Sequence, residues 1–281
     1  GVMIILSLLA ILPFWLLISA SFTDETYAIR EGYRFFPAQL SVDAYAFILK
    51  EWGQIGRAYL VTIVSTVIGT CVSIFITAGL AYGLSRRYLP GIKLFMILIL
   101  FTILINGRLV PTYFIYTNVL HIKNTIWALI VPGLLMNGFN VILAKNYMGT
   151  NIPGELMEAA QMDGCGELKM FFRIVLPLSL PILATIGLLS AVAYWNDWTN
   201  GLYYITNERL YSIQNLLNRM NENVMFMANN SSEMAGVDMS QLPSATIRMA
   251  IAVVGILPII AAYPFFQKYF AKGITFGAVK G

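Results

Sequence analysis

Six long apolar segments divide the chain, and most charged residues lie between them or near their ends. Each segment is close to the roughly 20 residues that an α-helix needs to cross a hydrocarbon core about 30 Å thick. Polar stretches separate the segments, as loops do between membrane helices. The pattern predicts an all-α polytopic membrane protein with six transmembrane helices at about 2–22, 59–84, 92–114, 125–147, 177–199 and 245–270.

Composition supports a single membrane domain over residues 1–281. Hydrophobic residues make up 58% of the chain and charged residues 11%, whereas soluble domains have about 25% charged residues. A cleaved signal peptide is the alternative for 2–22. The net charge of +4 needs no nucleic acid to explain it, because basic residues near helix ends face lipid headgroups. The spacing of Cys71 and Cys165 indicates neither a disulfide nor a metal site.

Basic residues in short loops predict the orientation, since such loops are enriched in lysine and arginine on the cytoplasmic side. The loop 85–93 holds Arg86, Arg87 and Lys93, and further lysines and arginines lie in 148–176 and in the tail. With six spans, these segments share one side. Both termini are therefore expected in the cytoplasm, with 200–243 as an extracellular loop that begins with a short helix near Leu210 to Met220.

Several spans carry residues that disturb helices or let them pack closely. Breakers are Asn106-Gly107-Arg108, Pro132-Gly133, Asn137-Gly138, Pro258 and Pro264. Freed backbone groups at such breaks must be satisfied inside protein or by a wet cavity, so structural kinks and pathway-lining helices are both open. In the second span small residues recur every four positions, at Ser65, Gly69, Ser73 and Thr77, followed by Gly79 and Gly83. This spacing predicts a helix-packing face.

Aromatic and amide residues near the fourth and fifth spans are candidates for contact with a solute. They are Asn137, Asn140, Tyr194, Trp195, Asn196 and Asp197. Polar groups within a membrane segment are functional candidates by default. The alternatives are an interfacial aromatic belt for Trp195, an ion pair of Asp197 with Arg108 or Arg248, and a helix neighbour for Asn137.

The segment between the fourth and fifth spans, residues 150–176, predicts two short helices. Pro153 suits a first helical turn and Glu155 the positive end of the helix dipole. Gly164 suits a left-handed stop. Leu156, Ala159 and Ala160 are spaced to share one face, and a second helix is expected from Glu167 to Leu176. From periodicity alone, an ordinary loop helix remains the alternative to a functional element.

The same segment carries a longer motif: E-A-A, three residues, G, nine residues, I, one residue, L-P. The residues at these positions are Glu158, Ala159, Ala160, Gly164, Ile174, Leu176 and Pro177. This arrangement resembles the EAA loop of bacterial ABC-importer permeases, with every signature position filled. Residues 124–129 and the tail 277–281 resemble the carbohydrate-uptake, maltose-type branch of this binding-protein-dependent family, and within it the permeases of lipoprotein or polysaccharide import.

The resemblance implies the permease subunit of an ATP-driven sugar importer. Such an importer would move an oligosaccharide inward across the bacterial cytoplasmic membrane. Implied partners are a second, homologous permease, two cytoplasmic ATPase subunits and an extracellular sugar-binding protein. The motif residues, with Asp163, would couple the chain to an ATPase, and Gly277 and Lys280 of the tail would contact the same subunits. No Walker A motif occurs in the chain, so ATP and magnesium are expected on the partner ATPase, with no cofactor, metal site or catalytic residue in this chain.

Other classes of membrane protein fit less well. A secondary transporter usually has ionisable residues deep in its spans and internal repeats, and neither is evident. An intramembrane hydrolase needs a nucleophile with a base, or a liganded metal, and the one histidine, His121, lies in an outer loop. A channel needs no coupling loop. Within the family, an importer of peptides or amino acids is the nearest alternative.

Overall fold

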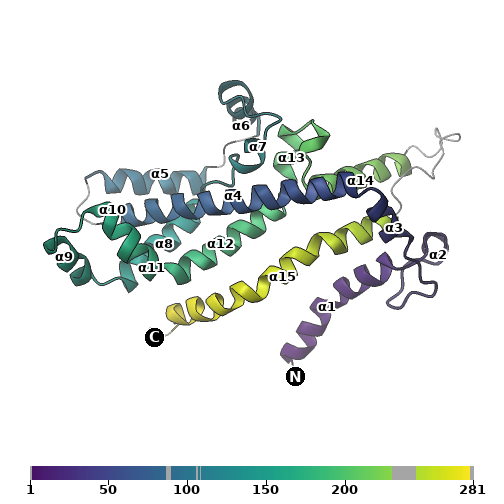
Figure 1. Cartoon of the computed structure of the whole chain (residues 1–281), viewed down its shortest axis with the longest axis horizontal. Coiled ribbons are helices and arrows are strands. Elements are labelled where there is room, and N and C mark those ends of the chain that lie inside the picture. Colours follow the sequence, from purple (N-terminus) through teal and green to yellow (C-terminus); the bar gives the residue numbers. More distant parts are fainter. Residues whose placement is uncertain (1, 87–89, 106, 108, 230–244, 279–281) are drawn as a thin grey trace. The chain divides into compact units, whose positions relative to one another are not determined.

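The computed structural model describes residues 2–86, 90–105, 107, 109–229 and 245–278, and the described chain is helical apart from turns and one bridge between Thr23 and Leu40 (Figure 1). The chain divides into two compact units, residues 1–61 with 207–261, and residues 62–206 with 262–281. The long helix α4, Trp52–Ser85, begins in the first unit and continues through the second.

The first unit contains the beginning of the chain and the segment before the last helix. Its elements are α1 (Val2–Ser21), α2 (Glu25–Glu31), α3 (Asp43–Lys50), the start of α4, the short helix η3 (Glu208–Leu210), α14 (Ile213–Asn229) and the first part, residues 245–261, of α15 (Ala245–Ala278). The Glu25 carboxylate accepts from the backbone N–H groups of Ala245 and Thr246 at 3.2 and 3.1 Å. A carboxylate at this place complements the positive helix end.

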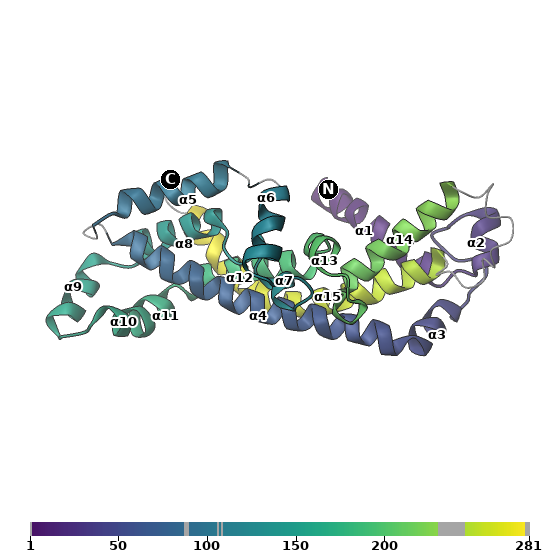
Figure 2. The ribbon, with the colours of Figure 1, turned by 90° about the horizontal axis from the view of Figure 1, so that it is seen from above.

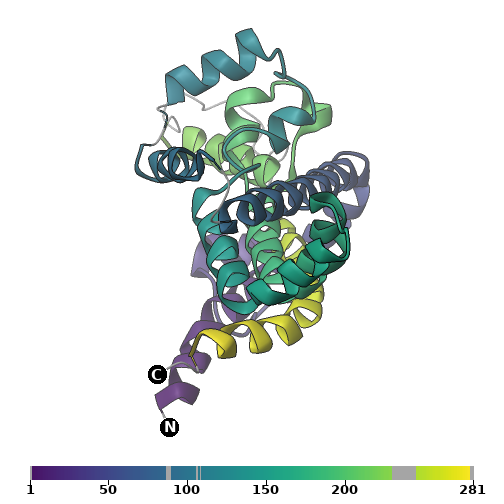
Figure 3. The ribbon, with the colours of Figure 1, turned by 90° about the vertical axis from the view of Figure 1, so that its left-hand side faces the viewer.

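The second unit contains the central helices and the 150–176 loop. Its elements are α5 (Ile92–Leu104), α6 (Leu109–Phe114), η1 (Ile115–Val119), α7 (Trp127–Ile130), α8 (Gly138–Asn151), α9 (Gly154–Met162), α10 (Glu167–Met170), η2 (Phe171–Val175), α11 (Leu176–Leu178), α12 (Leu180–Trp195) and α13 (Thr199–Tyr204). Helices α9, α10 and α11 lie together at one end of this unit (Figure 2). Figure 3 looks onto that end, where the green loop lies beside blue α4.

The predicted packing face on α4 is confirmed within the second unit. Ser73 and Thr77 are buried, and a Cβ at Gly69 would lie 2.4 Å from the Tyr194 ring of α12. A Cβ at Gly187 of α12 would lie 2.8 Å from the Ile74 side chain of α4. Small residues on both helices therefore allow α4 and α12 to approach closely. Gly79 and Gly83 differ, because a Cβ there meets nothing within 4 Å.

The fourth apolar segment, expected as one helix over 125–147, is two helices separated by residues 131–137. Pro132 lacks a backbone N–H, and Gly133 takes a left-handed φ of 71°. Asn137 then starts α8, because its side chain accepts from the N–H groups of Phe139 and Asn140 at 3.0 and 3.2 Å. The breakers Pro132-Gly133 and Asn137-Gly138 thus interrupt the helix completely, and Asn137 caps the helix that follows.

The other breakers have different outcomes. Helix α5 ends at Leu104 and α6 starts at Leu109, as expected around Asn106-Gly107-Arg108, although 106 and 108 lie outside the described residues. Within the fifth predicted segment, 177–199, helix α12 begins at Leu180 after a bend of 79° from the helices before it. Pro181 explains this start, since its ring excludes a continuous helix through Ser179. Helix α15 runs through Pro258 and Pro264 without interruption.

Two described helices, α1 and α4, are each long and apolar enough to cross a membrane. The pairs Ile92–Leu104 with Leu109–Val119 and Glu167–Leu178 with Leu180–Trp195 raise the number to four if each pair forms one span. The described part of the chain thus supports membrane insertion. Six spans remain a prediction.

Candidate coupling site

The first helix of the 150–176 loop, α9, ends in the glycine stop that the sequence predicts. Gly164 has a φ of 74°, a conformation that costs about 1–2 kcal/mol in residues with a Cβ. The Cys165 N–H donates to the Ala160 carbonyl oxygen at 2.9 Å, and the Gly164 N–H donates to Gln161 at 2.9 Å. These bonds satisfy carbonyl groups at the helix end. Gly164 therefore lets the chain turn at once into the second helix.

Two side chains of α9, Met157 and Ala160, pack inward. Met157 and Ala160 are buried, with 8% and 9% of their surface exposed. Leu156 is 41% exposed, and Glu158 and Ala159 are also exposed. Of the three residues predicted to share one face, Leu156, Ala159 and Ala160, only Ala160 is therefore buried. Met157 takes the inward position one turn before Ala160, because i and i+3 lie above one another on a helix.

The second helical stretch runs from Glu167 to Leu178, two residues beyond the expected end, through a π-helical turn at Phe171–Val175. Phe171 and Val175 are buried, and the Phe171 ring lies 5.4 Å from the Tyr82 ring of α4. Ile174 and Leu176 are half-buried against the same cluster, while Pro177 and Asp163 are exposed. The widened turn thus brings an aromatic side chain onto α4.

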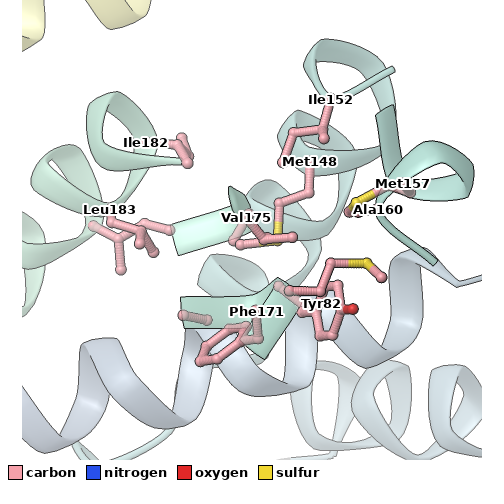
Figure 4. Packing of buried hydrophobic residues seen from close by; sticks show 14 residues of the cluster. Tyr82, Met148, Ile152, Met157, Ala160, Phe171, Val175, Ile182 and Leu183 are labelled. Carbon is pink, nitrogen blue, oxygen red and sulfur yellow. The ribbon is translucent and has the colours of Figure 1, made fainter. Parts of the chain in front are cut away.

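A hydrophobic cluster joins the loop to three long helices (Figure 4). Its buried members are Ala78, Ala81 and Tyr82 of α4, Ala144 and Met148 of α8, Ile152, Met157 and Ala160, Met170, Phe171 and Val175, and Ile182, Leu183 and Ile186 of α12. Contiguous buried side chains resist separation because each would expose apolar surface to water. The loop is therefore a packed projection from α4, α8 and α12.

A polar cluster beside this core holds the second helical stretch to the end of α4. The Arg86 guanidinium donates to the Tyr82 hydroxyl at 2.6 Å and lies 3.3 Å from a Glu167 carboxylate oxygen. The Tyr82 hydroxyl also donates to Glu167. Gln161 of α9 donates to the other Glu167 oxygen at 3.3 Å. Glu167 therefore connects α4 with both parts of the loop.

From the sequence, Arg86 indicates only the orientation of the chain. Its contacts with Tyr82 and Glu167 were not predicted. Its side chain is 9% exposed, against 53% for Glu167, and its guanidinium lies 4.8 Å from the Tyr82 ring centroid. The signal in the sequence was the pairing of Tyr82 and Arg86 four residues apart, which places them on one helix face. Glu167, 81 residues later, gave no sign of being their partner.

A hollow lies between α9 and the ends of α4 and α8, and the loop also has exposed apolar side chains. A cavity of about 430 Å³ is lined by Ser85, Arg86, Met148, Gly149, Ile152, Gly154, Met157, Glu158, Gln161 and Val175. Met162 is 89% exposed and Leu168 is 77% exposed. Exposed apolar side chains at the tip of a rigid projection are typical of a protein-docking surface. Glu158 thus lies on the hollow side, with Ala159 on the exposed surface of the same helix.

Several of the candidate solute contacts have intramolecular partners. The Tyr194 side chain is 3% exposed, and its hydroxyl donates to the Ile130 carbonyl oxygen of α7 at 2.9 Å. Asn137 caps α8. The Asp197 carboxylate accepts from the N–H groups of Thr199 and Asn200 at 3.1 and 3.2 Å, so it satisfies the first two backbone donors of α13. These side chains hold helices in place.

The other three candidates differ in exposure. Trp195 and Asn140 are buried, whereas Asn196 is exposed and donates to the Val192 carbonyl oxygen at 3.0 Å. Contact of these residues with a solute remains a prediction, and Arg108, one alternative partner of Asp197, lies outside the described residues. In the tail, Gly277 belongs to α15, and Lys280 lies outside the described residues. No metal-binding group of three His, Cys, Asp or Glu occurs among the residues with described positions.

The apolar helices define an α-helical membrane protein, and residues 150–176 form a packed projection between α8 and α12. Residues 86–276 match the family described as "Binding-protein-dependent transport system inner membrane component". The chain belongs to this family, the membrane permeases of ABC importers. The expected family is thus confirmed, and the site residues of its motif occupy a structured element.

Several known proteins resemble the chain over nearly its whole length. "Polygalacturonan/rhamnogalacturonan transport system permease protein YtcP" of Bacillus subtilis (strain 168) is 41% identical over 281 residues, which cover 100% of this chain and 96% of that protein. "Protein LplC" of the same organism is 38% identical over 97% of this chain and 90% of its own length. A solved bacterial ABC transporter involved in the import of the acidic polysaccharide alginate matches with a TM-score of 0.79 and 29% identity, over 96% of this chain and 94% of that one.

Proposed function

We propose that this chain is one permease subunit of an ATP-driven importer that carries an oligosaccharide inward across the cytoplasmic membrane. The observation that supports it most directly is the complete EAA motif on a packed two-helix projection, in a chain of the binding-protein-dependent family. The chain itself catalyses no reaction in this proposal. ATP and magnesium bind to partner ATPase subunits, whose closure moves the projection.

The partner set follows from the family and from the chemistry of the projection. Two ATPases dock from the cytoplasm, one on this chain and one on a second, homologous permease, and a solute-binding protein delivers the sugar on the outer side. Both termini then lie in the cytoplasm. Met162 and Leu168 supply exposed apolar surface for the ATPase, and the exposed Ala159 leaves room for a close approach of its backbone.

The docking test uses Ala159, since it is exposed whereas Ala160 is packed into the core. Ala159→Arg adds a long charged side chain to the docking face without filling the core. The expected result is loss of ATPase co-purification with the permease, and of ATP-dependent uptake, while membrane insertion and the melting temperature stay unchanged. The matched control is Ala46→Arg, at an exposed alanine of α3. Normal ATPase retention in Ala159→Arg would refute docking through this face.

An acidic oligosaccharide is the solute to test first. The proteins that the chain resembles are named for polygalacturonan and rhamnogalacturonan in one case and for alginate in another. In proteoliposomes that contain the importer and its binding protein, we expect ATP-dependent uptake of labelled oligogalacturonides. A neutral oligosaccharide and a peptide of similar size serve as competitors. Uptake of the peptide with no uptake of either sugar would contradict the proposal.

A further inference from the structure

A cavity of about 730 Å³ lies in the second unit where the end of α4, the start of α5 and the end of α8 meet. It is lined by Leu84, Ser85, Ile92, Lys93, Met96, Ile97, Lys145, Asn146, Gly149 and Thr150. Two lysines from different helices, Lys93 and Lys145, thus share one hollow with two hydroxyls and an amide. No acidic residue is among the lining residues.

The lysines give this cavity a positive character. Lys145 is half-buried in α8, and Lys93 is exposed at the first turn of α5. Within the described part of the chain, neither lysine forms an ion pair with a carboxylate. A lysine ammonium that is partly withdrawn from water favours an anionic partner. Thr150 and Asn146 provide further donors for the oxygen atoms of that anion.

A second cavity, of about 480 Å³, adjoins the first and has a different character. Leu84 and Ile92 line both. The remaining lining is Gly79, Leu80, Gly83, Pro90, Phe95, Leu98, Ile99, Thr102 and Met136, in which threonine is the one polar side chain. Gly79 and Gly83 keep this space open, because neither glycine has an atom within 4 Å of an added Cβ.

We propose that the two cavities together bind one anionic phospholipid. Its phosphate lies between Lys93 and Lys145, and an acyl chain follows the apolar cavity along Gly79 and Gly83. The pairing of a basic hollow with an apolar one favours a lipid over a soluble anion, which would leave the apolar cavity without a ligand. Basic pockets between membrane helices on the cytoplasmic side are suited to lipid headgroups. The inference rests on the proposed cytoplasmic position of this end, but not on the solute.

The test measures phospholipid retention by the purified importer, by native mass spectrometry during titration with phosphatidylglycerol. Three variants are compared with the unchanged protein. The first carries both Lys93→Gln and Lys145→Gln, the second carries Gly83→Leu, and the matched control is Lys50→Gln, at an exposed lysine of α3. We expect roughly 30-fold weaker binding in the double lysine variant, from two lysine contributions. Gly83→Leu should also lose binding, because leucine fills the apolar cavity, and Lys50→Gln should bind normally.

Further ligands separate the sources of the anion. Phosphatidylcholine tests the net charge, glycerol 3-phosphate tests the headgroup without acyl chains, and trigalacturonate tests an acidic sugar. Tight binding of either soluble anion, in competition with phosphatidylglycerol, overturns the proposal. Normal lipid binding by both the double lysine variant and Gly83→Leu also overturns it. So does the absence of retained lipid in the unchanged importer, a result that would indicate that the second permease fills the hollow. If the double lysine variant does not assemble, Gly83→Leu decides.

Oligogalacturonide uptake by the same preparations keeps this inference separate from the proposed function. If the unchanged importer takes up oligogalacturonide but retains no phosphatidylglycerol, this inference fails and the proposed function stands. Ala159→Arg should lose ATPase docking but keep phosphatidylglycerol, because Ala159 lines neither cavity.

Discussion

Replacement of Arg86 by methionine removes the guanidinium group but keeps an unbranched side chain in the same space. In the structure this guanidinium donates to Tyr82 at 2.6 Å, lies 3.3 Å from Glu167 and stacks 4.8 Å from the Tyr82 ring centroid. Because Tyr82 still donates to Glu167 in the variant, the two helices remain connected. We therefore expect weaker attachment of Glu167–Leu178 to α4, with the fold of α4 kept.

The magnitude follows from the individual contacts. A hydrogen bond to a charged group contributes about 1.5–3 kcal/mol, and a cation–π contact about 0.5–2 kcal/mol. The ion pair adds little, because the Glu167 side chain is 53% exposed and exposed pairs contribute about 0–1 kcal/mol. Methionine recovers part of the loss by apolar packing. A net loss of about 2 kcal/mol would raise the detached fraction about 30-fold.

Hydrogen–deuterium exchange of the purified permease measures this change directly. Amides of Glu167–Leu178 should exchange about 30-fold faster in Arg86→Met, whereas those in the middle of α4 should be unchanged. The control is Arg173→Met, at an exposed arginine of the same helical stretch. In a double-mutant cycle, Glu167→Gln should add less in the Arg86→Met background than alone, since the two residues share one network. Unchanged exchange in Arg86→Met would refute the view that this cluster holds the loop to α4.

Three further substitutions test local features of the second unit. Gly164→Ala, at a φ of 74°, should destabilise the end of α9 by about 1–2 kcal/mol and speed amide exchange there, whereas Gly166→Ala, with a negative φ, should change little. Gly69→Ala should lower the melting temperature in detergent, because the new methyl group would meet the Tyr194 ring at 2.4 Å and overpacking costs about 1–3 kcal/mol; Gly79→Ala on the same helix, with free space around it, should not. Asn137→Ala removes the cap of α8 and should cost about 1 kcal/mol, as measured by exchange at Phe139 and Asn140, and an equal effect of Asn196→Ala, at an exposed asparagine, would contradict the capping argument.

The features that the sequence predicts correctly depend on local rules. The stop at Gly164 follows from the freedom of glycine at positive φ. The packing face on α4 follows from a four-residue repeat of small residues. The helix expected near Leu210 to Met220 follows from apolar spacing that starts at Ile213, although α14 continues to Asn229. Each of these signals lies within one segment of the chain, so no knowledge of the neighbours was needed.

The features that were missed depend on contacts between distant segments. Leu156, Met157, Ala159 and Ala160 are all apolar, so periodicity alone does not select the inward face of α9. The cluster around Met148 and Tyr82 selects Met157 and Ala160. Pro132 and Gly133 were recognised as breakers, but the length of the interruption is set by where Asn137 caps α8.

In the proposed function the projection acts as a lever, and the position of Ala160 suits that role. Its small side chain is buried at the contact of α9 with the cluster, so α9 packs closely against helices that continue into the membrane segments. Any force on the exposed surface of α9 must then act on α8 through Met148 and on α4 through Tyr82, because separation would expose apolar surface. Ala159, about 100° further round the helix, is exposed. In the proposed function the two alanines of the motif therefore have different tasks: Ala160 joins the projection to this chain, and Ala159 leaves the exposed surface open for the ATPase.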